Sequence, residues 1–154
     1  MIRPRSATFL IGAWAAIQLA MPTPGDGAEA VVTSSGGATV VWSEWVNEHG
    51  PIAVVLWSSW APGAETTRGQ IDELAAAARQ HRLGLVLVSV QEPFEEADRA
   101  LKGLEVLWFH DRFGRLLKDY RVVAIPALVV VAADGRIAAR LDATAASLRD
   151  WKAE

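Results

Sequence analysis

The sequence predicts an α/β domain in which a central mixed sheet has parallel core strands and a C-terminal antiparallel hairpin, flanked by helices. Three observations support this fold class. Two short apolar runs, 52–57 and 85–90, are typical of parallel strands that are buried on both faces. The segment between them, 65–82, has apolar residues at helical spacing. Near the C-terminus, a valine-rich run ends at Ala133-Asp134-Gly135-Arg136, which favours a tight hairpin turn.

The first half of the chain can be divided at its turn residues. The Ser/Gly-rich segment 31–39 is expected to be a flexible lead-in to a domain that covers 40–154. Apolar residues within 40–48 share one helical face, although a short strand leading into a helix fits them equally well. Gly50-Pro51 ends this element, and Gly84 ends the helix expected at 65–82.

The second half is more regular. A short charged helix, an extended segment, a turn and a short helix are expected, in that order, at 93–101, 105–110, 111–114 and 116–120. The hairpin then joins strands at 127–132 and 137–141 through a two-residue turn. Asp142 or Thr144 can cap a final helix at 145–152. This order of elements is that of one layered α/β domain.

Length, charge and cysteine count exclude several classes of protein. At 154 residues, with 51% hydrophobic and 21% charged residues, the chain fits one globular domain. Its net charge is -3 and no long run has a single sign, which argues against a nucleic-acid binder. The chain has no cysteine, so it forms no disulfide, thiolate nucleophile or thiolate metal site.

The N-terminus has the three regions of a secretory signal peptide. Arg3 and Arg5 form a basic start, 7–21 is apolar, and a polar stretch ends at Ala28-Glu29-Ala30, a typical cleavage sequence. The apolar region is shorter than the about 20 residues that span a bilayer. We therefore expect 1–30 to be a signal peptide, with export to the periplasm or the extracellular space and no stable membrane anchor after cleavage.

The most informative segment follows the first buried strand. There, Trp60-Ala61-Pro62-Gly63-Ala64 forms a turn that leads into a helix. In a Trp-Cys-Pro-Gly-Cys turn, the first sulfur would lie at a helix N-terminus, where the helix dipole lowers the pKa of a thiol. Both sulfur positions are alanine here, so the segment has the frame of a redox site without its sulfur.

Three landmarks together resemble the thioredoxin-like superfamily, and in particular the TlpA-like exported thiol-disulfide oxidoreductases. They are the segment from Val54 through Ala64, Ala124-Ile125-Pro126 before a valine-rich strand, and Ala133-Asp134-Gly135-Arg136-Ile137. Asp111-Arg112-Phe113-Gly114-Arg115-Leu116 also has a counterpart in that family. The resemblance covers roughly 42–151 and implies a thioredoxin-like sandwich, with a cis-proline loop at Ile125-Pro126.

The same resemblance implies that the groups that carry out redox chemistry are missing. Ala61 and Ala64 occupy the positions of the two cysteines of the family. Val55 stands where thioredoxins have a buried aspartate, and Thr67 where TlpA-like proteins commonly have a glutamate. We therefore expect no catalytic residue and no thiol-disulfide activity from the chain as it stands.

Other residues offer little alternative chemistry. A hydroxyl nucleophile needs a base within hydrogen-bond reach, and the candidate hydroxyls are those of Ser58, Ser59, Thr66 and Thr67. His49 and His81 are expected to be solvated, while His110, the better candidate base, follows a strand expected to lie away from the turn. The acidic run Glu92, Glu95, Glu96 and Asp98 is interpreted as a solvated helix face. No histidine has metal-ligand spacing, so we expect no metal and no small-molecule cofactor.

Recognition of a protein or peptide needs no sulfur. By resemblance, Trp60, Pro62, Gly63, Ile125 and Pro126 should lie together, and the residue before the cis-proline should offer backbone groups to an extended peptide. Alternatively, Pro62 only starts a helix and Trp60 packs into the core, as is expected of Trp57.

Two functions follow, and a gene product without a selected role remains a third possibility. The first is an exported thioredoxin-like domain that lacks redox chemistry and binds a protein or peptide through the former substrate groove. The alternative is a cysteine-free variant of a TlpA-like thiol-disulfide oxidoreductase.

Overall fold

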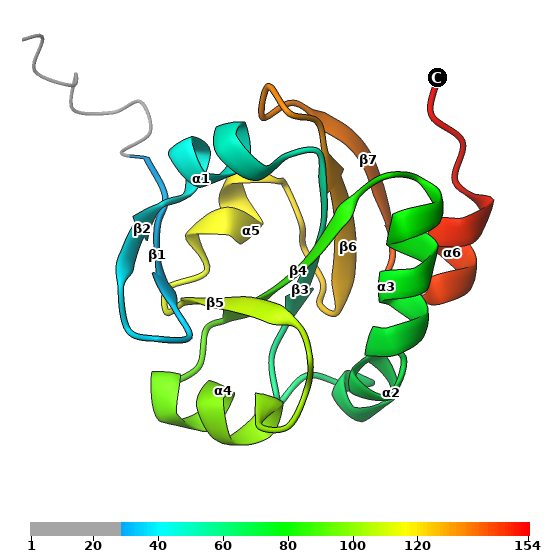
Figure 1. The fold of residues 1–154 in the computed structure, drawn as a ribbon. Helices are drawn as coiled ribbons and strands as arrows, with labels where there is room; N and C mark the ends of the chain where they lie inside the picture. The colour runs from blue at the N-terminus through cyan, green and yellow to red at the C-terminus, as the bar shows by residue number, and fades with distance from the viewer. Residues whose placement is uncertain (1–28) are drawn as a thin grey trace, which may run out of the picture.

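A computed structural model describes residues 29–154, and these form one mixed seven-stranded sheet with helices on both faces (Figure 1). The signal peptide predicted over 1–30 lies outside the described residues, except for its last two. In the part that is described, no helix is both long and apolar enough to cross a membrane.

The sheet has the parallel core and the antiparallel C-terminal hairpin that the sequence predicts. The strand order is β2-β1-β5-β4-β3-β6-β7, with β3, β4 and β5 parallel and every other pairing antiparallel. The strands are β1 (Val31–Ser34), β2 (Thr39–Val41), β3 (Ile52–Trp57), β4 (Gly84–Val90), β5 (Leu107–Asp111), β6 (Ala127–Val131) and β7 (Ile137–Asp142).

Helices cover both faces of the sheet and separate the core into two clusters. The helices are α1 (Trp42–His49), α2 (Ala64–Gly69), α3 (Ile71–Gln80), α4 (Phe94–Leu101), α5 (Arg115–Asp119) and α6 (Ala145–Asp150). Buried residues of α2, α3, α4 and α6 belong to one cluster, and those of α1 and α5 to the other. Alternate residues of β3 contribute to the two clusters, which explains why this strand is apolar at every position.

The segment 31–39 is not a flexible lead-in, and that prediction is wrong. β1 and β2 form a hairpin, and β1 extends the sheet by pairing with β5, where Thr33 lies opposite His110. The Ser/Gly residues form the hairpin turn, in which Gly37 has a φ of +88° and its N–H donates to the Ser34 carbonyl. Of the two alternatives for 40–48, the strand leading into a helix is the one found, as β2 followed by α1.

The helix expected at 65–82 is divided into α2 and α3. The division falls at Gln70, whose φ and ψ are -101° and 5°, directly after Gly69, a weak helix former. The Gln70 side chain accepts a hydrogen bond from the Ala145 N–H, at the first residue of α6. A tertiary contact therefore stabilises a break that local periodicity does not reveal.

The turn between β6 and β7 is one residue longer than predicted. The Ala132 N–H donates to the Arg136 carbonyl at 2.8 Å, which leaves three residues in the loop rather than two. Gly135, with a φ of +86°, supplies the left-handed conformation that such a loop requires. Thr144 is the residue that caps the final helix, because its hydroxyl oxygen accepts from the Ser147 N–H at 3.1 Å.

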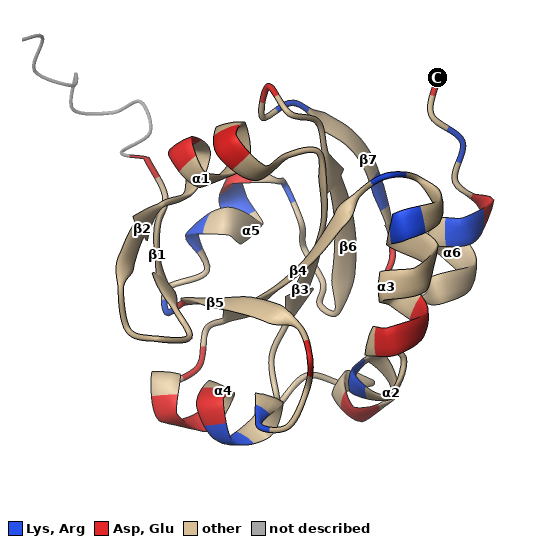
Figure 2. Cartoon of the chain, in the orientation of Figure 1, with Lys and Arg blue, Asp and Glu red and all other residues tan. Residues whose placement is uncertain are grey.

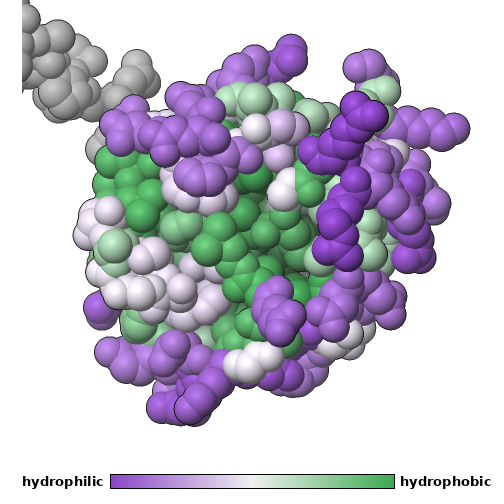
Figure 3. All heavy atoms as spheres, in the orientation of Figure 1, coloured by the Kyte–Doolittle hydropathy of each residue, from purple (hydrophilic) through white to green (hydrophobic). Residues whose placement is uncertain are grey.

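Charged and apolar residues are unevenly distributed over the surface. Figure 2 shows mainly acidic residues on α1 and α4, and both basic and acidic residues on α5 and α6. On the face seen in Figure 3, hydrophobic residues gather in the middle, over β4, with hydrophilic residues around them. The molecule is thus not uniformly covered by polar side chains.

Candidate functional site

The turn formed by residues 58–64, called the Trp60 turn below, lies where the three parallel strands end. β3, β4 and β5 run in the same direction, so the segments that follow them lie at the same edge of the sheet. The turn follows β3, Gln91 and Glu92 follow β4, and Arg112 and Phe113 follow β5. Segments that are distant in the sequence therefore lie at the same edge of the sheet as the turn.

Backbone hydrogen bonds define the turn itself. The Ala61 N–H donates to the Ser58 carbonyl at 3.1 Å, and the Ala64 N–H to the Ala61 carbonyl at 3.0 Å. Gly63 has a φ of +79°, and α2 begins at Ala64. Pro62 thus lies before the helix, so its interpretation as a residue of the first helical turn is wrong.

The two alanines at the family's cysteine positions are buried. Both Ala61 and Ala64 belong to the cluster that contains Trp57, and the Trp57 indole N–H donates to the Ala64 carbonyl at 3.0 Å. Trp57 is therefore a core residue, as expected. Val55 is also fully buried, and it pairs with Leu87 and Leu128 in the sheet, so this strand places no acid beneath the turn.

Trp60, in contrast, is a surface residue. Its side chain is 57% exposed, and the indole N–H donates to the Gln91 carbonyl at 3.2 Å. Of the two alternatives left by the sequence, exposure rather than core packing is therefore correct. The hydrogen bond orients the ring while leaving much of its apolar area in contact with solvent.

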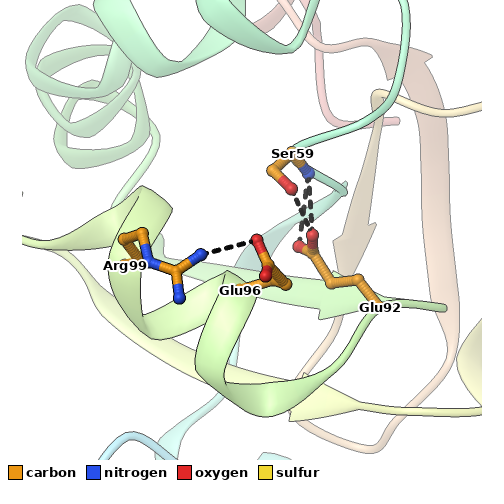
Figure 4. Close-up of polar contacts among 4 residues, drawn as sticks. All are labelled: Ser59, Glu92, Glu96 and Arg99. Atoms are coloured by element: carbon orange, nitrogen blue, oxygen red, sulfur yellow. Dashed lines mark hydrogen bonds and ion pairs between the residues drawn. The ribbon is translucent and has the colours of Figure 1, made fainter.

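Glu92, next to Gln91 in the segment after β4, also holds the turn. It is only 5% exposed, and both carboxylate oxygens accept from the Ser59 N–H at 3.2 Å. The hydroxyls of Ser59 and Ser89 donate to the same carboxylate. Figure 4 shows the Ser59 hydroxyl and amide facing Glu92, while Glu96 pairs with Arg99 separately on α4.

The interpretation of Glu92 as part of a solvated helix face is therefore wrong. Glu92 precedes α4, which begins at Phe94, and only the later acids of the run lie on that helix. The signal that could have identified it is its position directly after a buried parallel strand, at the edge where functional side chains gather. The adjacent Ser58 hydroxyl is also engaged, because it donates to the Val90 carbonyl.

His110 lies closer to the turn than the sequence predicts. It is part of β5, it is buried, and its Nε2 lies 2.6 Å from the Glu92 carbonyl oxygen. Its contact is with the backbone of Glu92 and not with a serine hydroxyl. Around the turn, the described residues therefore show no serine–histidine pair of the kind that activates a hydroxyl nucleophile.

The other two histidines lie elsewhere. The His49 ring stacks on Trp45, and the His81 ring lies 5.2 Å from that of Trp151. Within residues 29–154, no group of three or more histidine and acidic side chains is arranged to hold a metal ion.

The proline loop lies on the other side of the turn. The peptide bond between Ile125 and Pro126 is cis. Pro126 lines a hollow of about 290 Å³ together with Gly63, Thr66 and Thr67. The structure thus brings Gly63 and Pro126 together, while Trp60 is directed towards Gln91, and Ile125 is half-buried against both core clusters.

The fold and the turn define a thioredoxin-like α/β domain, and solved structures of this fold match the chain over most of its length. A secreted disulfide oxidoreductase of Mycobacterium tuberculosis, described as homologous to E. coli DsbE, is 18% identical, with a TM-score of 0.55; the match covers 73% of this chain and 81% of that one. StoA from Bacillus subtilis is 20% identical, with a TM-score of 0.60 and coverage of 80% and 96%.

A thiol-disulfide oxidoreductase from Bacteroides fragilis is 18% identical, with a TM-score of 0.59 and coverage of 73% and 89%. No protein-family model and no curated protein sequence matches the chain. The chain therefore shares its fold with thiol-disulfide oxidoreductases, although it contains no cysteine.

Proposed function

We propose that this chain is an exported thioredoxin-like domain without thiol chemistry, and that it binds an extended protein or peptide segment at the Trp60 turn. The surface would comprise Trp60, Pro62 and Gly63 with Ile125 and Pro126. The observation that carries the proposal is Trp60 itself, a large aromatic side chain that is 57% exposed in a turn held by hydrogen bonds.

An exposed and oriented tryptophan is well suited to binding. Tryptophan is enriched among the residues that dominate the affinity of protein interfaces, because burying its ring removes a large apolar area from water. A ring already held by the Gln91 carbonyl loses less side-chain freedom on binding than a mobile one. The neighbouring loop around Ile125 can offer backbone groups to an extended segment.

The arrangement of hydroxyls supports binding rather than catalysis. Ser58 and Ser59 donate to the Val90 carbonyl and the Glu92 carboxylate, and neither contacts a histidine. The positions that would hold sulfur are buried alanines. What the turn offers to a partner is therefore apolar surface and backbone groups.

Export is part of the same proposal. It is supported by the basic, apolar and small-residue regions of 1–30 and by a structural neighbour that is described as secreted.

The second candidate function, a cysteine-free variant of a thiol-disulfide oxidoreductase, is favoured by the hydrogen bond from the Ala64 N–H to the Ala61 carbonyl. That bond keeps the two cysteine positions within one turn.

Selection from a random twelve-residue peptide library on the immobilised full chain tests the binding proposal. We expect enriched peptides to bind Trp60→Ala about thirty-fold more weakly than the unchanged chain, the loss typical of an interface hot spot. Leu107→Ala is the matched control, because Leu107 is 48% exposed but begins β5, at the opposite edge of the sheet. Enrichment that is insensitive to Trp60, or no enrichment at all, would exclude the proposed surface.

A further inference from the structure

We infer that the segment bound at the Trp60 turn carries carboxylate groups beside its apolar anchor, because Arg112 and Phe113 extend the surface onto the loop between β5 and α5. This inference rests on the proposed function and specifies the chemistry of the partner.

Contacts through Gln91 connect the two loops. The Gln91 carbonyl accepts from the Trp60 indole at 3.2 Å, and the Gln91 N–H donates to the Asp111 carbonyl at 3.1 Å. Gly114 packs closely on the Gln91 side chain, since a Cβ at Gly114 would lie 2.9 Å from the Gln91 Cγ. Phe113 directly precedes Gly114, so Gln91 contacts both the turn that carries Trp60 and the loop that carries Phe113.

Phe113 adds apolar area to this edge of the sheet. Its side chain is 82% exposed, more than that of Trp60. Gly114 has a φ of +67°, a conformation that favours glycine and ends the loop before α5 begins. Trp60 and Phe113 thus both expose aromatic surface on the segments that follow parallel strands, where a partner could cover them.

Arg112 supplies the charge. Its guanidinium carbon lies 5.6 Å from the centre of the Phe113 ring, a distance at which cation and aromatic face attract each other. No carboxylate forms an ion pair with Arg112 within residues 29–154. A stacked guanidinium keeps the donors at its edge available for a carboxylate from a partner.

The neighbouring carboxylates are engaged elsewhere. Asp111 is buried, and its two oxygens accept from the N–H groups of Arg115 and Leu116 at 3.1 and 2.8 Å. The carboxylate of Glu92 accepts from Ser59 and Ser89. Neither of these acids neutralises Arg112, so this part of the surface complements an acidic group next to an apolar one.

The peptide selection described above, repeated on charge variants, tests the inference. For the unchanged chain we expect Asp and Glu to be enriched about three-fold over the input library, as a single exposed ion pair allows. Arg112→Gln should remove this enrichment while apolar residues remain enriched. Phe113→Ser should weaken the acidic peptides further, and salt at about 0.5 M should weaken them on the unchanged chain.

Two controls separate charge at this loop from charge in general. Glu95→Gln changes an exposed acid of α4 and should leave the acidic enrichment unchanged, as should Leu107→Ser at the opposite edge. If Trp60-dependent peptides show no acidic enrichment, or keep it in Arg112→Gln, the inference is wrong and the proposed function stands. If no Trp60-dependent peptide is enriched, the proposed function fails and the inference fails with it.

Discussion

Glu92 is the residue on which the conformation of the Trp60 turn depends most directly. Its buried carboxylate accepts hydrogen bonds from one backbone N–H and two serine hydroxyls, and none of the ion pairs within residues 29–154 includes it. Hydrogen bonds to a charged acceptor are stronger than those between neutral groups. The turn is thus held by a group that belongs to a different loop.

We therefore predict that Glu92→Ala lowers the free energy of unfolding by about 2–3 kcal/mol, because Ser59 and Ser89 lose their acceptor in a buried site. Urea unfolding measures the change. Glu95→Gln, three residues later and exposed, should change stability by less than about 0.5 kcal/mol. Equal effects of the two substitutions would contradict the role assigned to Glu92.

Tyr120 allows a second measurement on a single residue, because it is the only tyrosine of the chain. Burial raises the pKa of its hydroxyl from 10.0 to about 12; the hydrogen bond from the Trp42 indole opposes this rise, and the Asp119 charge adds to it. We predict that a titration followed by tyrosinate absorbance has its midpoint about two pH units above that of the unfolded chain. A midpoint near 10 would show that the hydroxyl is solvated.

The same shift predicts a loss of stability in alkali. The pKa of Tyr120 is higher in the folded state than in the unfolded state. Its contribution to the free energy of unfolding is therefore fully present below pH 10 and is lost as the pH rises towards 12. The free energy of unfolding should fall by about 2–3 kcal/mol over this interval from Tyr120 alone. Tyr120→Phe should lack this part of the decrease, although it leaves the Trp42 N–H without its acceptor.

Among the elements, the β1-β2 hairpin differs most from its prediction. Val31 and Val32 are adjacent on β1, but Val31 is 53% exposed and Val32 is 1% exposed, within the core cluster that contains β3 and α1. The hairpin is therefore part of the folded domain and not a segment that precedes it.

We predict that Val32→Ala costs about 2 kcal/mol of stability, because it removes buried methyl groups and leaves a cavity. Val31→Ala, its neighbour on the exposed side, should cost less than about 0.5 kcal/mol. The comparison is made from urea midpoints at an unchanged slope. A flexible lead-in would make both substitutions neutral.

For the whole molecule, the question is whether this fold still has the geometry of a redox site. The hydrogen bond from Ala64 to Ala61 closes a four-residue turn, and the Cα atoms at the ends of such a turn lie within about 7 Å. Disulfides join Cα atoms about 4.4–6.8 Å apart. The Cα atoms of Ala61 and Ala64 therefore lie close to the separation that a disulfide requires.

We predict that the double variant Ala61→Cys, Ala64→Cys forms an intramolecular disulfide on oxidation, measured by thiol counting and mass. The unchanged chain should reduce insulin no faster than the uncatalysed background, because it contains no thiol. Ala61→Cys alone is the control and cannot form this bond. Two persistent free thiols in the double variant would show that the frame has lost the required geometry.

Much of the fold could be predicted because its signals are local. The apolar runs of β3 and β4, the Pro62-Gly63 turn and the spacing of α4 depend on residues close together in the sequence. For the candidate site, motifs in the sequence named Trp60 and Pro126, and their role in binding stays a prediction. The burial of Glu92 under Ser59 could not be predicted, because it depends on which strand ends lie side by side.

The sequence alone therefore determined the α/β fold class and the absence of thiol chemistry, since burial on both faces requires apolar strands and alanine cannot replace sulfur. Only the tertiary structure decided that 31–41 joins the sheet, that Gln70 divides a helix, and that Glu92 is buried beneath Ser59. Each of these depends on a partner that is distant in the sequence. In these three cases the solvent exposure and the hydrogen bonds depend on β5, Ala145 and Ser59, and not on the residues that are adjacent in the sequence.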